Sequence, residues 1–88
     1  MAYSDEHQTL QALLEELSGH EKNIKFSNLL KICKDVFGAF RMNGGHHIFK
    51  TPWPGDPRIN LQKTGNMAKP YQVKQVIEAL RKLISIVK

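Results

Sequence analysis

The spacing of apolar residues along this chain changes twice, and the two changes limit what it can fold into. Up to Phe37, and again from Pro70, apolar residues recur every three or four positions, which is typical of amphipathic helices. Between these segments polar and apolar residues alternate, which is typical of half-buried strands. The chain therefore predicts helices at both ends and a sheet in the middle, an α+β fold.

Turn signals divide these segments into six elements. Helices are expected over residues 5–18, 27–37 and 70–88, and strands over residues 39–42, 46–51 and 58–62. The turn sequence Asn43-Gly44-Gly45 joins the first two strands, and the proline-rich segment 52–57 cannot join a ladder. The order α-α-β-β-β-α predicts a three-stranded antiparallel sheet with helices packed on one face. We expect a single domain over 1–88, with an N-terminal helix and linker at 1–22 and the core at 23–88.

Charge and cysteine content narrow the classes of function. Thirteen Lys and Arg against eight Asp and Glu give a net charge of +5, which favours an anionic partner. The single cysteine, Cys33, excludes an internal disulfide and a multi-cysteine zinc site, and it is expected to be a buried structural thiol. No metal and no small-molecule cofactor are predicted. A polar N-terminus and the lack of a long apolar run predict a cytoplasmic protein with no membrane partner.

The pleat of the second predicted strand separates its two histidines. Successive side chains of a strand point to opposite faces, so His46 and His47 cannot chelate one metal ion together. If Phe49 packs toward the helices, His47 shares its face and His46 points outward with Ile48 and Lys50. The opposite choice would bury a lysine, which is costly without a partner. The open face would then carry His46, Lys50, Arg58, Asn60 and Gln62, with Lys63 and Lys69 at its rim.

A histidine on an open basic face can cleave RNA. Near neutral pH an imidazole can accept a proton from a ribose 2′-hydroxyl while nearby cations hold the phosphate, and this chemistry needs no metal. The candidate phosphate contacts are Lys50, Arg58, Lys63, Lys69 and Lys74. The alternative is that the histidine is a solvated bystander and the lysines only keep the protein soluble.

Two aromatic residues, Trp53 and Tyr71, each allow two interpretations. Trp53 could stack on an unpaired base or close a loop over the edge of the core. Tyr71 could cap the core or touch the ligand.

Three stretches of the chain carry a resemblance to a known family. They are Gly44-Gly45-His46-His47-Ile48-Phe49-Lys50, then Ile59-Asn60-Leu61, then Lys69-Pro70-Tyr71-Gln72-Val73-Lys74-Gln75-Val76. Together they resemble the HicA-type toxins of bacterial toxin–antitoxin modules, over roughly residues 26–84.

The resemblance implies a fold, an activity and two partners. HicA-type toxins have a fold similar to the double-stranded-RNA-binding domain, cleave mRNA, and are neutralised by a HicB-type antitoxin protein. Their active residue is the histidine of a Gly-Ser-His-type motif at the start of the second strand. Gly44 matches the glycine of this motif, Gly45 stands where it has serine, and His46 matches its histidine.

The resemblance thus implies an endoribonuclease with His46 as catalytic residue and with Gly44 and Gly45 beside the RNA. His47 is the fallback catalyst, since a one-residue shift of the strand would exchange the two faces. Slow turnover is expected, because the open face offers no general acid. Two other functions stay open. One is a non-catalytic RNA-binding module, and the other is a protein-interaction domain that docks an acidic antitoxin.

Overall fold

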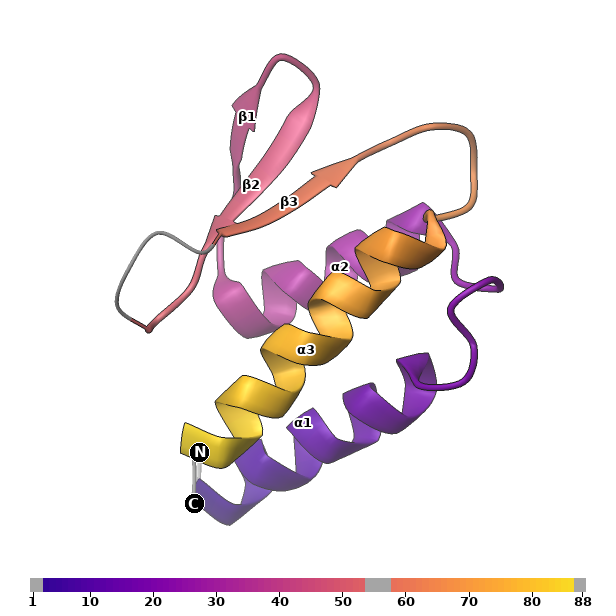
Figure 1. The fold of residues 1–88 in the computed structure, drawn as a ribbon. Coiled ribbons are helices and arrows are strands. Elements are labelled where there is room, and N and C mark those ends of the chain that lie inside the picture. Colours follow the sequence, from indigo (N-terminus) through magenta and orange to yellow (C-terminus); the bar gives the residue numbers. More distant parts are fainter. Residues whose placement is uncertain (1–2, 54–57, 87–88) are drawn as a thin grey trace.

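The structure, a computed structural model, has helices at both ends of the chain and strands between them, as the spacing of apolar residues predicts. The structure describes residues 3–53 and 58–86, so part of the expected proline-rich break lies outside the described residues. The elements are α1 (Tyr3–Leu17), α2 (Phe26–Phe37), β1 (Arg41–Asn43), β2 (His46–Lys50), β3 (Arg58–Gln62) and α3 (Pro70–Ile86). The predicted α+β order α-α-β-β-β-α is confirmed (Figure 1).

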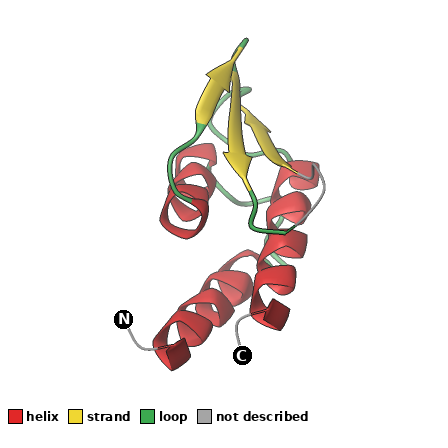
Figure 2. Ribbon diagram, turned by 90° about the vertical axis from the view of Figure 1, so that its left-hand side faces the viewer, coloured by secondary structure: helices red, strands yellow, loops and turns green. Residues whose placement is uncertain are grey.

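The three strands form one antiparallel sheet in the order β1-β2-β3. The helices lie on one side of this sheet, and α1 lies against α3, away from the strands (Figure 2). No described helix covers the other face of the sheet, which is called the open face below.

Alternation in β2 and β3 buries one face of the sheet. Phe49, Ile59 and Leu61 are almost fully buried, whereas Lys50, Arg58, Asn60 and Gln62 are exposed. The buried side chains join a core to which all three helices contribute, chiefly through Leu17, Leu29, Cys33, Val73, Val76 and Leu80. Burial of one large apolar side chain stabilises a fold by about 1.5–3 kcal/mol, so this contact fixes which face of the sheet points to solvent.

Gly44 and Gly45 set the register of the β1–β2 hairpin. Asn43 pairs with His46, which leaves a two-residue loop, and both glycines have positive φ, 59° and 86°. Such loops favour a turn with positive φ at both positions, where residues with a Cβ are strained. Because this turn holds Asn43 opposite His46, β1 covers 41–43 rather than the predicted 39–42.

The hairpin turn generates a prediction about stability. A Cβ at either glycine would meet no atom within 4 Å, so substitution there costs backbone strain alone. We expect Gly45→Ala to lower the free energy of unfolding by about 1–2 kcal/mol. Gly44→Asn is the control, since Asn-Gly is a preferred pair in this turn, and it should cost much less. Urea denaturation measures both, and equal losses would contradict the turn assignment.

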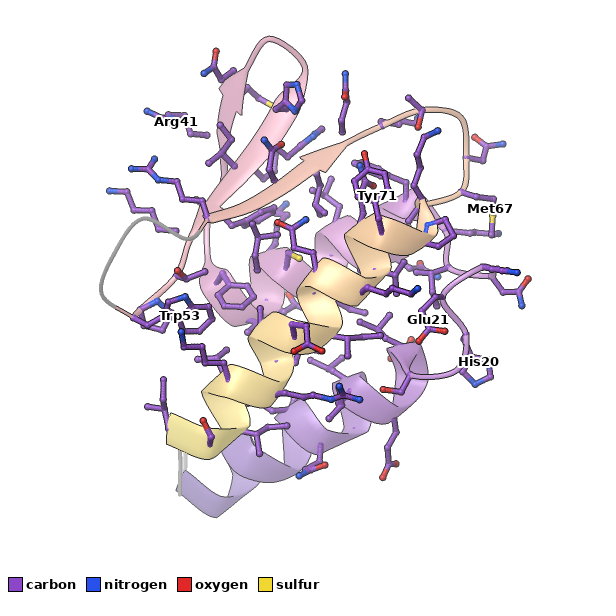
Figure 3. All side chains as sticks on the ribbon, in the orientation of Figure 1. His20, Glu21, Arg41, Trp53, Met67 and Tyr71 are labelled. Carbon is purple, nitrogen blue, oxygen red and sulfur yellow. The ribbon has the colours of Figure 1, made fainter. Side chains whose placement is uncertain are left out.

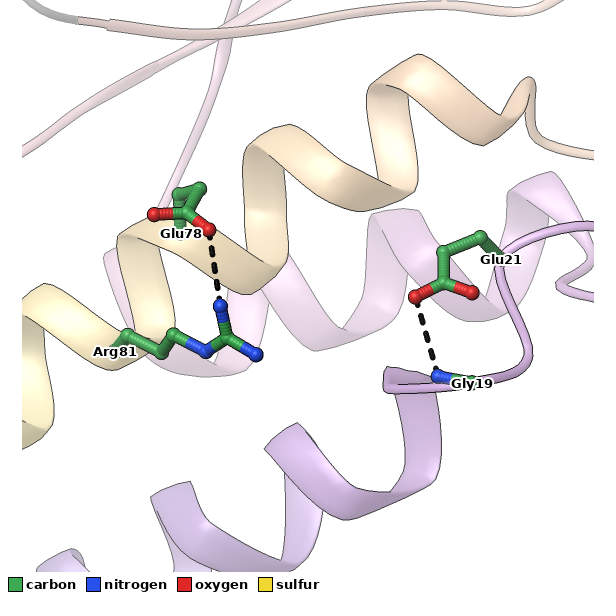
Figure 4. Close-up of polar contacts among 4 residues, drawn as sticks. All are labelled: Gly19, Glu21, Glu78 and Arg81. Carbon is green, nitrogen blue, oxygen red and sulfur yellow. Dashed lines mark hydrogen bonds and ion pairs between the residues drawn. The ribbon is translucent and has the colours of Figure 1, made fainter.

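Backbone hydrogen bonds hold the connections around α2. Phe26 N–H donates to the Asn66 carbonyl (2.9 Å) and Ala68 N–H donates to the Ile24 carbonyl (2.8 Å), which ties the β3–α3 loop to the start of α2. In the α1–α2 connection the Gly19 N–H donates to the Glu21 carboxylate at 3.1 Å (Figure 4). The backbone N–H groups of Glu21 itself and of Gly19 lower the pKa of this carboxyl.

The expected burial of Cys33 is confirmed, and it generates a second prediction. The thiol is fully buried, and desolvation raises its pKa to about 12. Because the thiolate is the reactive form, almost none is present at pH 8 in the folded protein. We expect a thiol reagent at pH 8 to label Cys33 only as fast as the chain unfolds, with rapid labelling in denaturant. Fast labelling of the native protein would contradict this.

Candidate active site

The strand registers arrange the open face of the sheet in three rows of side chains. Directly paired residues share a face, so one row holds Asn43, His46 and Gln62, and the next holds Arg41, Ile48 and Asn60. The third row pairs Lys50 with Arg58. Rows along a strand are about 7 Å apart. The face therefore places an imidazole at one end and cations toward the other.

The His46 imidazole is hydrogen-bonded across the sheet. Its Nδ1 lies 2.8 Å from Oδ1 of Asn60, one row away on the neighbouring strand. An amide oxygen only accepts hydrogen bonds, so Nδ1 carries the proton in the neutral ring and donates it. The second nitrogen, Nε2, then holds the lone pair. Asn60 thus sets the tautomer that a general base needs.

Asn60 is held in turn by α3. Its backbone N–H donates to Oε1 of Gln75 (3.0 Å), and its carbonyl accepts from Nε2 of the same side chain (3.2 Å). One turn earlier, the Gln72 side chain donates from Nε2 to the Gln62 carbonyl (3.0 Å). These two glutamine amides take the place of a further strand along the outer edge of β3. Asn60 and Gln75 are residues to which the sequence analysis assigns no role at the site.

His47 lies on the other face, as expected for the residue that shares a face with Phe49. Its ring packs edge-on against Phe40 (4.7 Å between centroids) and Phe26 (5.5 Å), and its Nδ1 donates to the Leu61 carbonyl at 3.2 Å. This packing keeps His47 among aromatic rings beside the core. The geometry therefore favours His46 over His47 as the group that meets a ligand.

The structure gathers only some of the predicted phosphate contacts near His46. Lys50 and Arg58 are exposed on its face, two rows away. Lys63 follows Gln62, the direct cross-strand neighbour of His46. Gly44 and Gly45 are exposed in the turn that precedes His46.

Two predicted contacts lie apart from this face. Lys69 is at the start of α3, where its carbonyl accepts from the Gln72 and Val73 N–H groups. Lys74 lies close enough to Glu21, in the α1–α2 connection, to lower the pKa of that carboxyl further.

One cation of the open face, Arg41, is not among the site residues predicted from the sequence. Arg41 of β1 stands directly beside Ile48 of β2, on the same face as His46. Its role follows from the hairpin register, since the strand alone does not indicate to which side of the sheet Arg41 points.

The two aromatic residues with open readings occupy different surroundings. Trp53 packs edge-on against Phe37 of α2 (6.4 Å between centroids), and Nζ of Lys82 in α3 lies 4.8 Å from its ring centroid, so Trp53 lies at the edge of the core beside both helices. Tyr71 is 62% exposed and does not cap the core. It lies one helical turn before Gln75, at the first turn of α3 (Figure 3).

The described part of the chain holds neither a metal-binding cluster nor a membrane-spanning helix. In residues 3–53 and 58–86 no three His, Cys, Asp or Glu side chains come together in a way that could hold a metal ion. Within the same residues no helix has the length and apolar character needed to cross a membrane.

Comparison with known proteins identifies no relative of this chain. No protein-family model, curated protein or solved structure matches the chain.

The bond between His46 and Asn60 generates a prediction that needs no activity assay. In ¹⁵N-labelled protein with neutral histidines, we expect the His46 ring to carry its proton on Nδ1, because Oδ1 of Asn60 accepts it. Asn60→Ala should shift His46 toward the Nε2–H tautomer and leave His47, which donates to Leu61, unchanged. Histidine ring ¹⁵N shifts distinguish the tautomers. A wild-type His46 protonated on Nε2 would contradict the assignment.

Proposed function

We propose that this protein is a metal-independent endoribonuclease that cleaves mRNA, with His46 as its general base. The observation that carries the proposal is the hydrogen bond from His46 Nδ1 to Asn60 Oδ1, on a solvent-accessible face that also bears cations. This bond leaves Nε2 free of the ring proton and available to a ribose hydroxyl. The resemblance to HicA-type toxins, in which the equivalent histidine is the active residue, supports the same role.

The proposed reaction is an internal attack within the RNA. Nε2 of His46 takes the proton of the 2′-hydroxyl, the 2′-oxygen bonds to the adjacent phosphorus, and the bond from phosphorus to the 5′-oxygen breaks. The products are a 2′,3′-cyclic phosphate and a 5′-hydroxyl, whose proton comes from solvent. Lys63, next to the cross-strand neighbour of His46, would stabilise the negative charge on the reacting phosphate, and Lys50 and Arg58, two rows away, would hold a neighbouring phosphate. Protonation by solvent instead of a positioned acid gives slow turnover.

The RNA would extend beyond this centre along the basic surface. The exposed Gly44-Gly45 turn would allow the RNA backbone close to His46, and Lys69 and Lys74, at the start of α3 and off the open face, would contact nucleotides that pass beyond the edge of β3. We propose the cytoplasm, where mRNA is accessible, as the place of action. A HicB-type antitoxin, covering the basic face, is the protein partner that the resemblance and the net charge of +5 favour.

Parallel cleavage assays test the proposal. We expect His46→Ala to reduce the rate of transcript cleavage by about 10²–10⁴-fold, the usual contribution of a general base, while RNA binding is retained. His20→Ala is the matched control, because His20 is exposed in the α1–α2 connection and should leave the rate unchanged. Asn60→Ala should lower the rate about 3- to 10-fold, as for loss of one hydrogen bond, and Asn60→Asp should restore it.

Other outcomes point to other functions. Cleavage that survives in His46→Ala but is lost in a folded His47→Ala variant would move the catalytic role to His47. A wild-type protein that binds RNA without cleaving it would be a non-catalytic RNA-binding module. Binding to an acidic protein partner far tighter than to RNA, with no toxicity on expression alone, would instead indicate a docking domain.

A further inference from the structure

A hollow of about 430 Å³ lies between the open face and the α2–β1 connection, at the end of the sheet remote from His46. Each strand contributes one cation to its wall: Arg41 from β1, Lys50 from β2 and Arg58 from β3. The remaining wall is mainly apolar and includes Phe37, Phe40 and Ile48. Its volume is in the range of roughly 300–1,000 Å³ that is typical of small-ligand sites.

The charged side chains that line this hollow in the described part of the chain are all cations. Among residues 3–53 and 58–86, no carboxylate lines it. Arg41 extends from β1 away from the helices (Figure 3). Arginine guanidinium groups bind phosphate through two parallel hydrogen bonds, which makes a phosphate a fitting occupant between Arg41 and Arg58.

The position of the hollow relative to His46 is set by the registers. Arg41 lies in the row next to His46, and Lys50 and Arg58 lie one row further. At about 7 Å per row, the cations begin about 7 Å from the His46 row and continue to about 13 Å. One extended nucleotide can bridge this separation. The apolar side chain of Ile48 in this wall offers a surface for a base, which a simple anion would not need.

We infer that this hollow binds the nucleotide next to the cleaved bond, with its phosphate on Arg41, Lys50 and Arg58 and its base against Ile48. The inference rests on the proposed nuclease function, since it takes single-stranded RNA as the ligand. It makes Arg41 a binding residue and lays the RNA along the strands, from His46 toward Lys50 and Arg58.

Binding of non-cleavable RNA tests the hollow separately from catalysis. The probes are fluorescent oligonucleotides of two to six nucleotides with 2′-O-methyl riboses, measured by anisotropy at several salt concentrations. Arg41→Gln should weaken binding several-fold and reduce the slope of log K against log salt by about 0.7, as for one lost phosphate contact to a single strand. Lys22→Gln, the same charge change at an exposed position in the α1–α2 connection, should do neither.

Two further comparisons locate the contact. The gain in affinity on adding the nucleotide next to the cleavage position should be lost in Arg41→Gln. Ile48→Thr should weaken binding of the normal oligonucleotide and leave an abasic oligomer of equal length unaffected, because only the base meets Ile48.

The outcomes separate this inference from the proposed function. Equal RNA affinity of wild type and Arg41→Gln would overturn the hollow as a nucleotide site, while His46-dependent cleavage would still stand. Weaker binding by Arg41→Gln, together with no cleavage by wild type, would support the hollow and overturn the nuclease. If oligo-glutamate of equal charge binds as tightly and with the same dependence on Arg41, the occupant is an acidic protein and the inference is overturned.

Discussion

Burial of Phe49, Ile59 and Leu61 against α2 and α3 is the contact on which the rest of the structure depends. Each of these side chains is 2% exposed or less, and together they fix the orientation of β2 and β3. In a pleated strand a residue and its neighbours point to opposite faces, so this burial sends His46, Lys50 and Arg58 to the open side. A shift of one residue would bury these charges and expose Phe49, at a cost of several kcal/mol.

Hydrogen bonds from α3, the helix that covers the edge of β3, also hold the site in position. Gln75 pairs with both backbone groups of Asn60, and the Asn60 side chain accepts from His46. The imidazole is therefore connected through β3 to α3 and does not depend on the exposed hairpin alone for its position. Because α3 also packs against α1, the helix that supports the site is held between β3 and a second helix.

Features that depend on neighbouring residues can be predicted from the sequence, whereas features that depend on contacts between residues distant in the sequence cannot. Alternation along β2 predicts which histidine faces outward, because the side-chain period of a strand is a local property. The bonds from Gln72 and Gln75 join residues 10 and 15 positions apart, and a glutamine within a helix carries no sign of its partner. Arg41 joins the site only because the loop at Gly44-Gly45 has two residues, which moves β1 along from its expected position. Thus the sequence predicts that His46, Lys50 and Arg58 share the open face. It does not predict the hydrogen bonds that support His46 or the place of Arg41 on that face.

The two margins of the sheet are protected in different ways. Along β3, the glutamine amides of α3 occupy the main-chain groups of Asn60 and Gln62 that another strand would need. At the opposite margin β1 has only three residues and carries a charged side chain, both of which discourage pairing with a neighbouring molecule. Neither border of this sheet therefore favours pairing with a strand of another molecule, although one face of the sheet carries no helix.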